Sequence, residues 1–205
     1  MTRFSPAFGP RAAGVLAATA LALAIVPSAQ AANSTAGCDA QVAEQPFLRW
    51  LDPAAYVLVP GGTVERWAGW NLEGAAARTW GNEPYYVHDE DDTWSLAIPA
   101  GSSATTAPMC VGVEHPTLRL LVRNRGSLAS PLRVEVLFED ALGLRRAVTI
   151  GDYLGTSRWQ PTPPLAVLAN LLLLGDHVEV AFRFTAGTGG DWFIDDVYVD
   201  PFRHG

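Results

Sequence analysis

The feature that most constrains the fold of this chain is strict alternation near its C-terminus. In the segment Val178–Ala186, every second side chain up to Phe184 is apolar, whereas Glu179 and Arg183 lie between the apolar positions. Successive side chains of a β-strand point to opposite faces, so this pattern predicts a strand with one face toward a core and the other toward water.

Shorter runs of the same kind, broken by Gly, Pro, Asn and Asp, recur through the chain. The predicted strands are Tyr56–Val59, Trp70–Thr79, Trp94–Ile98, Thr106–Val113, Thr117–Asn124, Leu132–Asp140, Leu144–Ile150, Ala166–Leu174, Val178–Ala186 and Trp192–Val199. Residues 165–174 could instead form a short helix, because their apolar run is continuous. About ten short strands predict an all-β protein, an antiparallel β-sandwich in one domain spanning residues 55–205.

The N-terminus has the pattern of a secretory signal peptide. Arg3 and Arg11 precede the apolar run Ala12–Val26, and the small residues Ala29-Gln30-Ala31 follow it, so we expect cleavage near residue 31. Removing residues 1–31 takes away two positive charges and no acids, which moves the net charge from −7 to −9. We therefore expect a secreted, extracytoplasmic bacterial protein without a membrane span, and the negative charge argues against nucleic acid as a partner.

The two cysteines, Cys38 and Cys110, are predicted to form a disulfide in an oxidising compartment. The bond would tether the N-terminal segment, residues 32–54, and would contribute about 4 kcal/mol in the chain-entropy model. An alternative is that Thr35-Ala36-Gly37-Cys38 is a lipobox, with Cys38 lipidated. Cys38 lies well beyond the apolar run, and this favours the disulfide.

No catalytic motif stands out in the sequence. The four histidines lie far apart and show no zinc-ligand spacing, and Gly101-Ser102-Ser103 reads as a turn instead of a nucleophile elbow. All 14 basic side chains are arginines, which excludes Schiff-base chemistry on a lysine. No pair of carboxylates is marked out for glycoside hydrolysis. We therefore predict a protein that is not an enzyme.

Two motifs near opposite ends of the domain carry a family resemblance. The first is Pro60-Gly61-Gly62-Thr63-Val64-Glu65, followed by Trp67 and Trp70, and the second is Trp192-Phe193-Ile194-Asp195-Asp196-Val197. Together they resemble the carbohydrate-binding modules of jelly-roll type, which have a galactose-binding-like β-sandwich, with Val64 replacing the usual aromatic residue. The resemblance implies a jelly roll in which the first and last strands lie close together.

The resemblance also implies a structural calcium ion near the two motifs. Glu65, Asp195 and Asp196 would supply the hard oxygen ligands that Ca²⁺ prefers. The alternative is that one aspartate accepts backbone hydrogen bonds or pairs with Arg66, while the other faces water. A second acidic run, His88 to Asp92, lacks the spacing of an EF-hand loop and is predicted to be a solvated turn.

The seven tryptophans suggest an aromatic platform for a ligand. Most should be core residues, but Trp80, Tyr85, Tyr86 and Trp159 lie in loops or at strand ends, where a ring could stack on a sugar. If the strands alternate as expected, polar side chains face away from the core and could bind sugar hydroxyls. These side chains are Arg119, Arg123, Arg133, Glu135, Glu139, Glu179 and Arg183.

Two functions therefore remain open from the sequence. The first is a secreted, non-catalytic module that binds a polysaccharide or a cell-wall glycan through exposed aromatic residues. The second is an envelope-associated or accessory β-sandwich that contacts proteins and has no sugar ligand. The sequence does not specify an oligomeric state.

Overall fold

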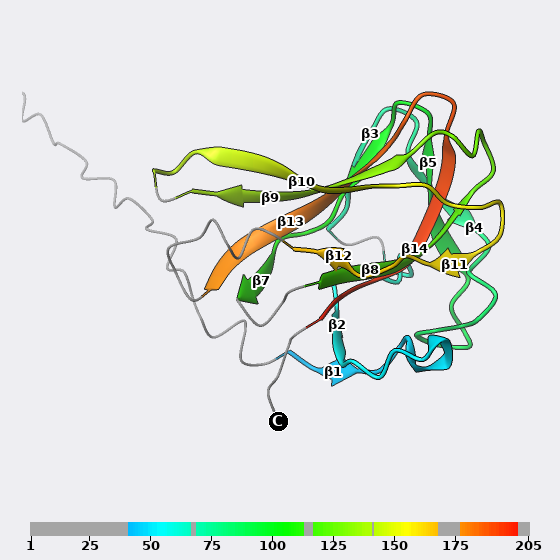
Figure 1. Ribbon diagram of the computed structural model, residues 1–205, viewed down its shortest axis with the longest axis horizontal. Coiled ribbons are helices and arrows are strands. Elements are labelled where there is room, and N and C mark those ends of the chain that lie inside the picture. The colour runs from blue at the N-terminus through cyan, green and yellow to red at the C-terminus, as the bar shows by residue number, and fades with distance from the viewer. Residues whose placement is uncertain (1–40, 67–68, 113–116, 141, 168–176, 201–205) are drawn as a thin grey trace, which may run out of the picture. The chain divides into compact units, whose positions relative to one another are not determined.

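The computed structural model describes residues 41–66, 69–112, 117–140, 142–167 and 177–200, which belong to one compact unit. These residues form two antiparallel sheets packed face to face, so the predicted β-sandwich is confirmed (Figure 1). No helix among the described residues is long and apolar enough to cross a membrane. Cys38 and the signal-peptide region lie outside the described residues, so the Cys38–Cys110 disulfide and the signal peptide remain predictions.

The first sheet has β14 at its centre, with β8 along one side and β5 and then β2 along the other. Beyond these lie β4 and β1, while β11 and β12 pair with β8. The strands of this sheet are β1 (Ala43–Glu44), β2 (Tyr56–Leu58), β4 (Ala77–Trp80), β5 (Trp94–Pro99), β8 (Thr117–Asn124), β11 (Gln160–Pro161), β12 (Leu165–Ala166) and β14 (Asp191–Asp200).

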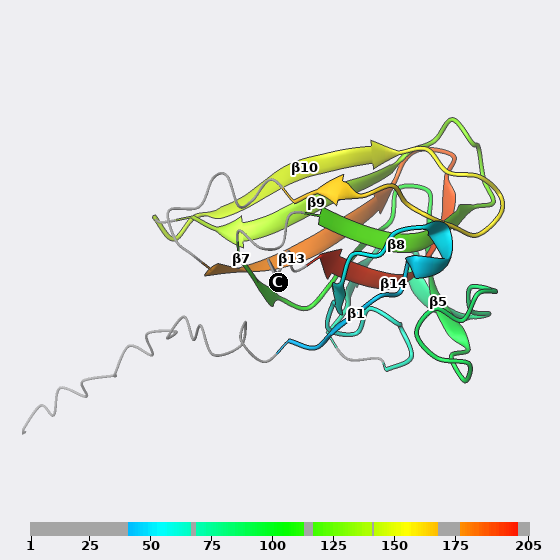
Figure 2. The same ribbon diagram turned by 60° about the horizontal axis from the view of Figure 1, so that its bottom comes forward.

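The second sheet has the order β10-β9-β13-β6-β3, and β7 also pairs with β13. Its strands are β3 (Asn71–Glu73), β6 (Ser103–Thr105), β7 (Met109–Gly112), β9 (Leu132–Glu139), β10 (Arg145–Tyr153) and β13 (His177–Ala186). Figure 2 shows β10, β9 and β13 in one layer and β8 and β14 in the other.

The main core lies between the sheets and follows the alternation seen in the sequence. Val180, Phe182 and Phe184 of β13 are almost fully buried there, opposite Leu120 of β8 and Ile194 of β14. Two predicted strands differ from the observed ones. Residues 70–79 form β3 and β4 because the chain turns at Gly74, whose φ of 71° favours glycine. Residues 106–113 contribute only β7, while β6 lies before them.

Simple alternation would predict a solvated outer face for the first sheet, but this face is covered by another part of the chain. A 3-10 helix, η1 (Leu48–Trp50), and the chain around it cover this face and form a second core. Phe47 is fully buried against Tyr56 and Tyr198, with ring centroids 5.0 and 5.8 Å away. The described part of the N-terminal segment is therefore an integral layer of the domain.

Candidate functional site

The two sequence motifs meet in the middle of the first sheet. The Val59 amide donates a hydrogen bond to the Val197 carbonyl (2.9 Å), and the Val197 amide donates one to the Gly62 carbonyl (3.2 Å). A Cβ atom at Gly62 would lie 2.6 Å from the Val197 carbonyl oxygen, so this approach requires glycine. The expected proximity of the first and last strands of the jelly roll is confirmed.

This junction contains a β-bulge that buries both aspartates. Where β14 changes partner from β5 to β2, its register with β8 shifts between Asp195 and Tyr198. Asp196 adopts a φ of 47°, a conformation that few non-glycine residues use except Asn and Asp. Asp195 and Asp196 are 0% and 1% exposed, so neither faces water. A bulge in a central strand thus places two carboxylates inside the protein.

A loop carboxylate, Glu83, joins the aspartates from 112 residues away. It is fully buried, and its two oxygens accept hydrogen bonds from the amides of Tyr85 (2.5 Å) and Val87 (2.6 Å). The Glu83 amide in turn donates to Asp195 Oδ2 (3.4 Å). Burial raises the pKa of Glu83, although these backbone donors oppose the effect. Neither a motif nor periodicity marked Glu83 in the sequence.

The other aspartate of the bulge, Asp196, is the least satisfied member of this acidic cluster. Among the described residues, no donor group hydrogen-bonds to either of its carboxylate oxygens, although both are buried. Burial raises its pKa well above the usual value, and the charges of Glu83, Asp92 and Glu44 add to the rise. Both polar atoms of the Asn82 side chain also lack partners. An unpaired buried carboxylate is costly, so the site favours either a proton or a bound cation.

The prediction that the run from His88 to Asp92 is a solvated turn is wrong for Asp92. Asp89 and Asp91 are exposed as expected, but Asp92 is only 9% exposed and its Oδ2 lies 3.0 Å from His88 Nδ1. Burial raises the pKa of Asp92, and Glu65 and Asp89 add smaller contributions in the same direction. The sequence treated residues 88–92 as one run, whereas the fold turns the last carboxylate inward.

The glutamate proposed as a calcium ligand, Glu65, has other partners. Its Oε1 accepts hydrogen bonds from the amides of Thr93 (2.7 Å) and Trp94 (2.6 Å) at the start of β5, and its Oε2 lies 3.8 Å from Arg78. Among the described residues, no three His, Cys, Asp or Glu side chains are already grouped in a way that could hold a metal ion. Metal binding by Glu65, Asp195 and Asp196 therefore remains a prediction.

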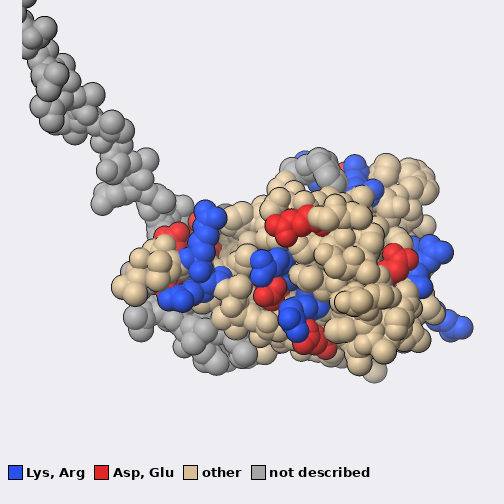
Figure 3. All heavy atoms as spheres, turned by 90° about the horizontal axis from the view of Figure 1, so that it is seen from above, with Lys and Arg blue, Asp and Glu red and all other residues tan. Residues whose placement is uncertain are grey.

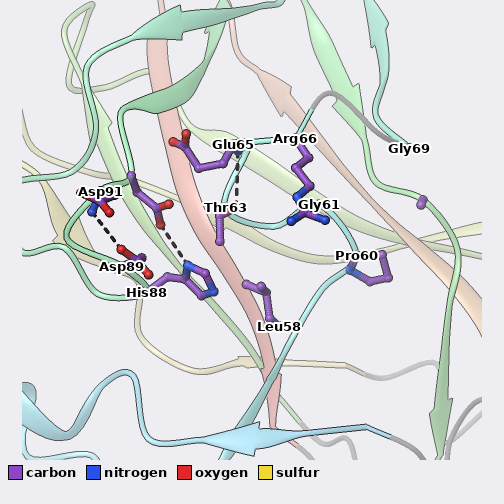
Figure 4. Close-up of a pocket in the computed structure, with 12 residues that line it drawn as sticks. Leu58, Pro60, Gly61, Thr63, Glu65, Arg66, Gly69, His88, Asp89 and Asp91 are labelled. Atoms are coloured by element: carbon purple, nitrogen blue, oxygen red, sulfur yellow. Dashed lines mark hydrogen bonds and ion pairs between the residues drawn. The ribbon is translucent and has the colours of Figure 1, made fainter.

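A pocket of about 740 Å³ opens beside this acidic region (Figure 4). Glu65, His88 and Asp91 line it together with Asp92, and Arg66 reaches in from another part of the wall. Thr63 lies between these walls, so both polar and apolar side chains surround the space. Its size suits a small ligand or one unit of a polymer.

The predicted aromatic platform is only partly present. Trp80 is 71% exposed and Tyr86 is 52% exposed, as a platform requires. Tyr85 is half-buried and donates a hydrogen bond to the Trp159 carbonyl (3.0 Å). The expected exposure of Trp159 is wrong: its side chain is 7% exposed, because it packs in the second core.

Trp80 lies at the edge of the first sheet, where β4 ends. It pairs with Trp94 across β4 and β5, and the two rings meet edge to face at 5.3 Å. The guanidinium of Arg78 lies 4.1 Å from the centroid of Trp94. Glu65 links this aromatic edge to the pocket. It lines the pocket, its backbone carbonyl accepts a hydrogen bond from Arg78, and its side chain accepts one from the Trp94 amide.

The polar side chains predicted to share one face lie on two sheets. On the second sheet, Arg133 pairs with Asp152 (2.9 Å) and Arg183 with Glu135 (2.8 Å), so this face carries the expected cross-strand ion pairs. Figure 3 shows basic and acidic side chains interspersed on the molecule seen from above. On the first sheet, Arg119 is buried instead of solvated, because the N-terminal segment covers it and supplies Asp52 as its partner.

The buried carboxylates give a testable pH dependence. A raised folded-state pKa means that stability is greatest below the unfolded pKa and is lost as pH rises through the folded pKa. Because burial raises the pKa of Asp195 and Asp196, we expect the melting temperature in chelator to increase as the pH falls from 7 to about 5. Asp52, whose pKa is lowered, loses its contribution only at lower pH. A melting temperature that falls steadily over the same window would contradict this expectation.

Comparisons with known proteins found similar solved structures but no matching family or curated sequence. Among solved structures, the xylan-binding domain CBM22-1 of Paenibacillus barcinonensis Xyn10C is similar over 67% of this chain and 88% of its own, with 11% identity and a TM-score of 0.48. The family 11 carbohydrate-binding module of the Clostridium thermocellum cellulase Lic26A-Cel5E is similar over 74% and 99%, with 10% identity and a TM-score of 0.41.

A third similar structure is larger than this chain. It contains the CBM22-1 and GH10 modules of Clostridium thermocellum xylanase 10B; the match covers 67% of this chain and 26% of that one, with 13% identity and a TM-score of 0.46. The antiparallel β-sandwich that the resemblance to jelly-roll carbohydrate-binding modules implied is shown by the strand pairing of this chain itself. The ligand has to be argued from the side chains of this chain.

Proposed function

We propose that this protein is a non-catalytic β-sandwich that binds a glycan at the edge formed by Trp80 and Trp94. The observation that carries the proposal is the 71% exposure of Trp80, whose ring is held edge to face by Trp94. An exposed indole that a neighbouring ring holds in place can stack its apolar face on a sugar ring. The neighbouring pocket offers carboxylates and Arg66 for the hydroxyl groups.

Replacing Trp80 by alanine should remove most of the glycan binding. We expect a loss of about 2 kcal/mol or more, roughly thirtyfold in Kd, since aromatic anchors dominate binding sites. The measurement is titration of wild-type and Trp80→Ala protein with a panel of soluble polysaccharides, followed by tryptophan fluorescence and affinity electrophoresis. The melting temperature should change little, because the side chain is mostly exposed.

Leu142→Ala is the matched control, because Leu142 is 80% exposed but lies in the hairpin between β9 and β10. It should bind like the wild type. Equal binding by Trp80→Ala would place the ligand elsewhere. Silence of the wild type across the whole panel would favour the alternative function, a β-sandwich that contacts proteins.

We also propose a structural calcium ion at the buried acidic cluster. The support is the pair of buried Asp196 oxygens, which accept no hydrogen bond from a donor of the described residues and lie near the carboxylates of Glu83 and Asp92. Carboxylate and amide oxygens are the ligands that Ca²⁺ prefers, and the ion would supply the positive charge that these carboxylates lack. Because no ligand set is already formed, the side chains would have to turn toward the ion on binding.

A further inference from the structure

The outer face of β8 carries arginines in two contrasting states. The first is Arg119, whose site is complete. Its guanidinium pairs with Asp52, its Nε donates to the Thr162 carbonyl (2.9 Å), and it lies 4.4 Å from the Phe47 ring centroid. A buried arginine is stable when its charge and its donors are matched in this way.

The second is Arg123, four residues further along the same face, and its site is incomplete. Cross-strand pairing brings it beside Phe193, and its guanidinium lies 4.4 Å from the Phe193 centroid and 4.9 Å from that of Trp159. Its Nε is buried and has no hydrogen-bond partner among the described residues. In the part of the chain that the structure describes, no ion pair includes Arg123.

A second cation, Arg125, lies beside the first and forms no ion pair with any residue that the structure describes. Its guanidinium lies 5.8 Å from the centroid of the same Phe193 ring, and its side chain is exposed. Burial lowers the pKa of Arg123 and the charge of Arg125 lowers it further, while Asp191 acts in the opposite sense. Two guanidiniums therefore share one aromatic support, and the only carboxylate acting on Arg123 forms no ion pair with it among the described residues.

The geometry suits a planar anion. Trp159 and Phe193 are less than 10% exposed, so the arginines, and not the rings, meet the solvent. A guanidinium supported by aromatic rings binds carboxylates in bidentate fashion, and its affinity grows where water is excluded. The protein as a whole carries a net charge of −7, which would repel a dense polyanion such as a nucleic acid. A single carboxylate on a sugar would interact mainly with the local positive charges of Arg123 and Arg125.

We propose that Arg123 and Arg125 form a subsite for the carboxylate of a uronic-acid residue in a glycan. The polymeric nature of the ligand rests on the proposed function, but the subsite is separate from the Trp80 edge. Trp80 and Trp94 share the face of the first sheet that carries Leu96, whereas Arg123 and Phe193 lie on the opposite face. The two contributions can therefore be tested independently.

The test compares a galacturonate oligomer with its methyl ester, which keeps the sugar chain and removes the charge. Isothermal titration with the full chain should show tighter binding of the acid, weakening as salt is added. Arg123→Gln and the exposed Arg125→Gln should each weaken binding of the acid by about tenfold or more, the loss of one charge-assisted hydrogen bond, and leave the ester unaffected. Asp191→Asn should tighten binding of the acid.

Arg133→Gln is the control, because Arg133 lies on the other sheet and is already paired with Asp152. Equal binding of acid and ester, unchanged in both arginine variants, would overturn the subsite and leave the proposed function intact. Displacement of the oligomer by inorganic phosphate at equal concentration would reveal a general anion site and overturn the uronate assignment. If no glycan of any kind binds, the proposed function fails and the subsite fails with it.

Discussion

Calcium should raise the melting temperature of the wild-type protein, and Asp196→Asn should abolish that rise. A ligand that binds only the folded state stabilises it by RT ln(1 + [L]/Kd), which is about 2.7 kcal/mol at a hundredfold excess over Kd. No donor group of the described residues hydrogen-bonds to the Asp196 oxygens, so the ion would be their main compensation. Thermal unfolding in calcium and in chelator measures the effect.

In chelator, Asp196→Asn should instead raise the melting temperature above that of the wild type. Without the cation, Asp196 places a charge beside Glu83 and Asp92 in the interior, and removing that charge should raise the melting temperature. Asparagine also tolerates the φ of 47° at this position, so the backbone should not be strained. Asp89→Asn, an exposed carboxylate of the same acidic region, is the control and should leave both values unchanged. A wild-type melting temperature that is equal in calcium and chelator would refute the calcium proposal.

The strands were the most predictable part of the structure, because alternation is a local property of the sequence. β8 has the predicted bounds, Thr117–Asn124, and β13 extends the predicted strand by one residue. The prediction failed where a distant segment determines the environment. β14 alternates much less clearly than β13 because both of its faces are covered, one by the main core and the other by the N-terminal segment.

The candidate site was predictable only in part, because some of its residues are brought together only by the folded chain. The resemblance placed the first motif, Pro60 to Glu65, close to the second, Trp192 to Val197, and the hydrogen bond between Val197 and Gly62 confirms that proximity. Glu83 could not be found, because only the folded loop brings it to residues 112 positions later. Arg123 and Trp159 were both chosen as ligand residues, and the fold does place them 4.9 Å apart. It also buries Trp159, so the arginine and not the indole is available to a ligand.

The N-terminal segment should prove essential for stability, although it lies outside the predicted sandwich domain. Phe47 is fully buried, with Tyr56, Tyr198 and the guanidinium of Arg119 around its ring. Truncating a buried phenylalanine leaves a cavity, so Phe47→Ala should lower the free energy of unfolding by about 3–5 kcal/mol. Urea denaturation of the wild-type and variant proteins measures the change.

The neighbouring residue provides the control for this prediction. Leu48 belongs to η1 but is 53% exposed, so Leu48→Ala should change the free energy of unfolding by less than about 1 kcal/mol. A small effect at both positions would mean that the segment is not packed on the sheet in solution. A large effect at Phe47 alone would show that this layer is needed to bury the outer face of β14. In that case Arg119 stays enclosed, and Arg123 and Arg125 are the arginines of β8 and its end that remain open to a ligand.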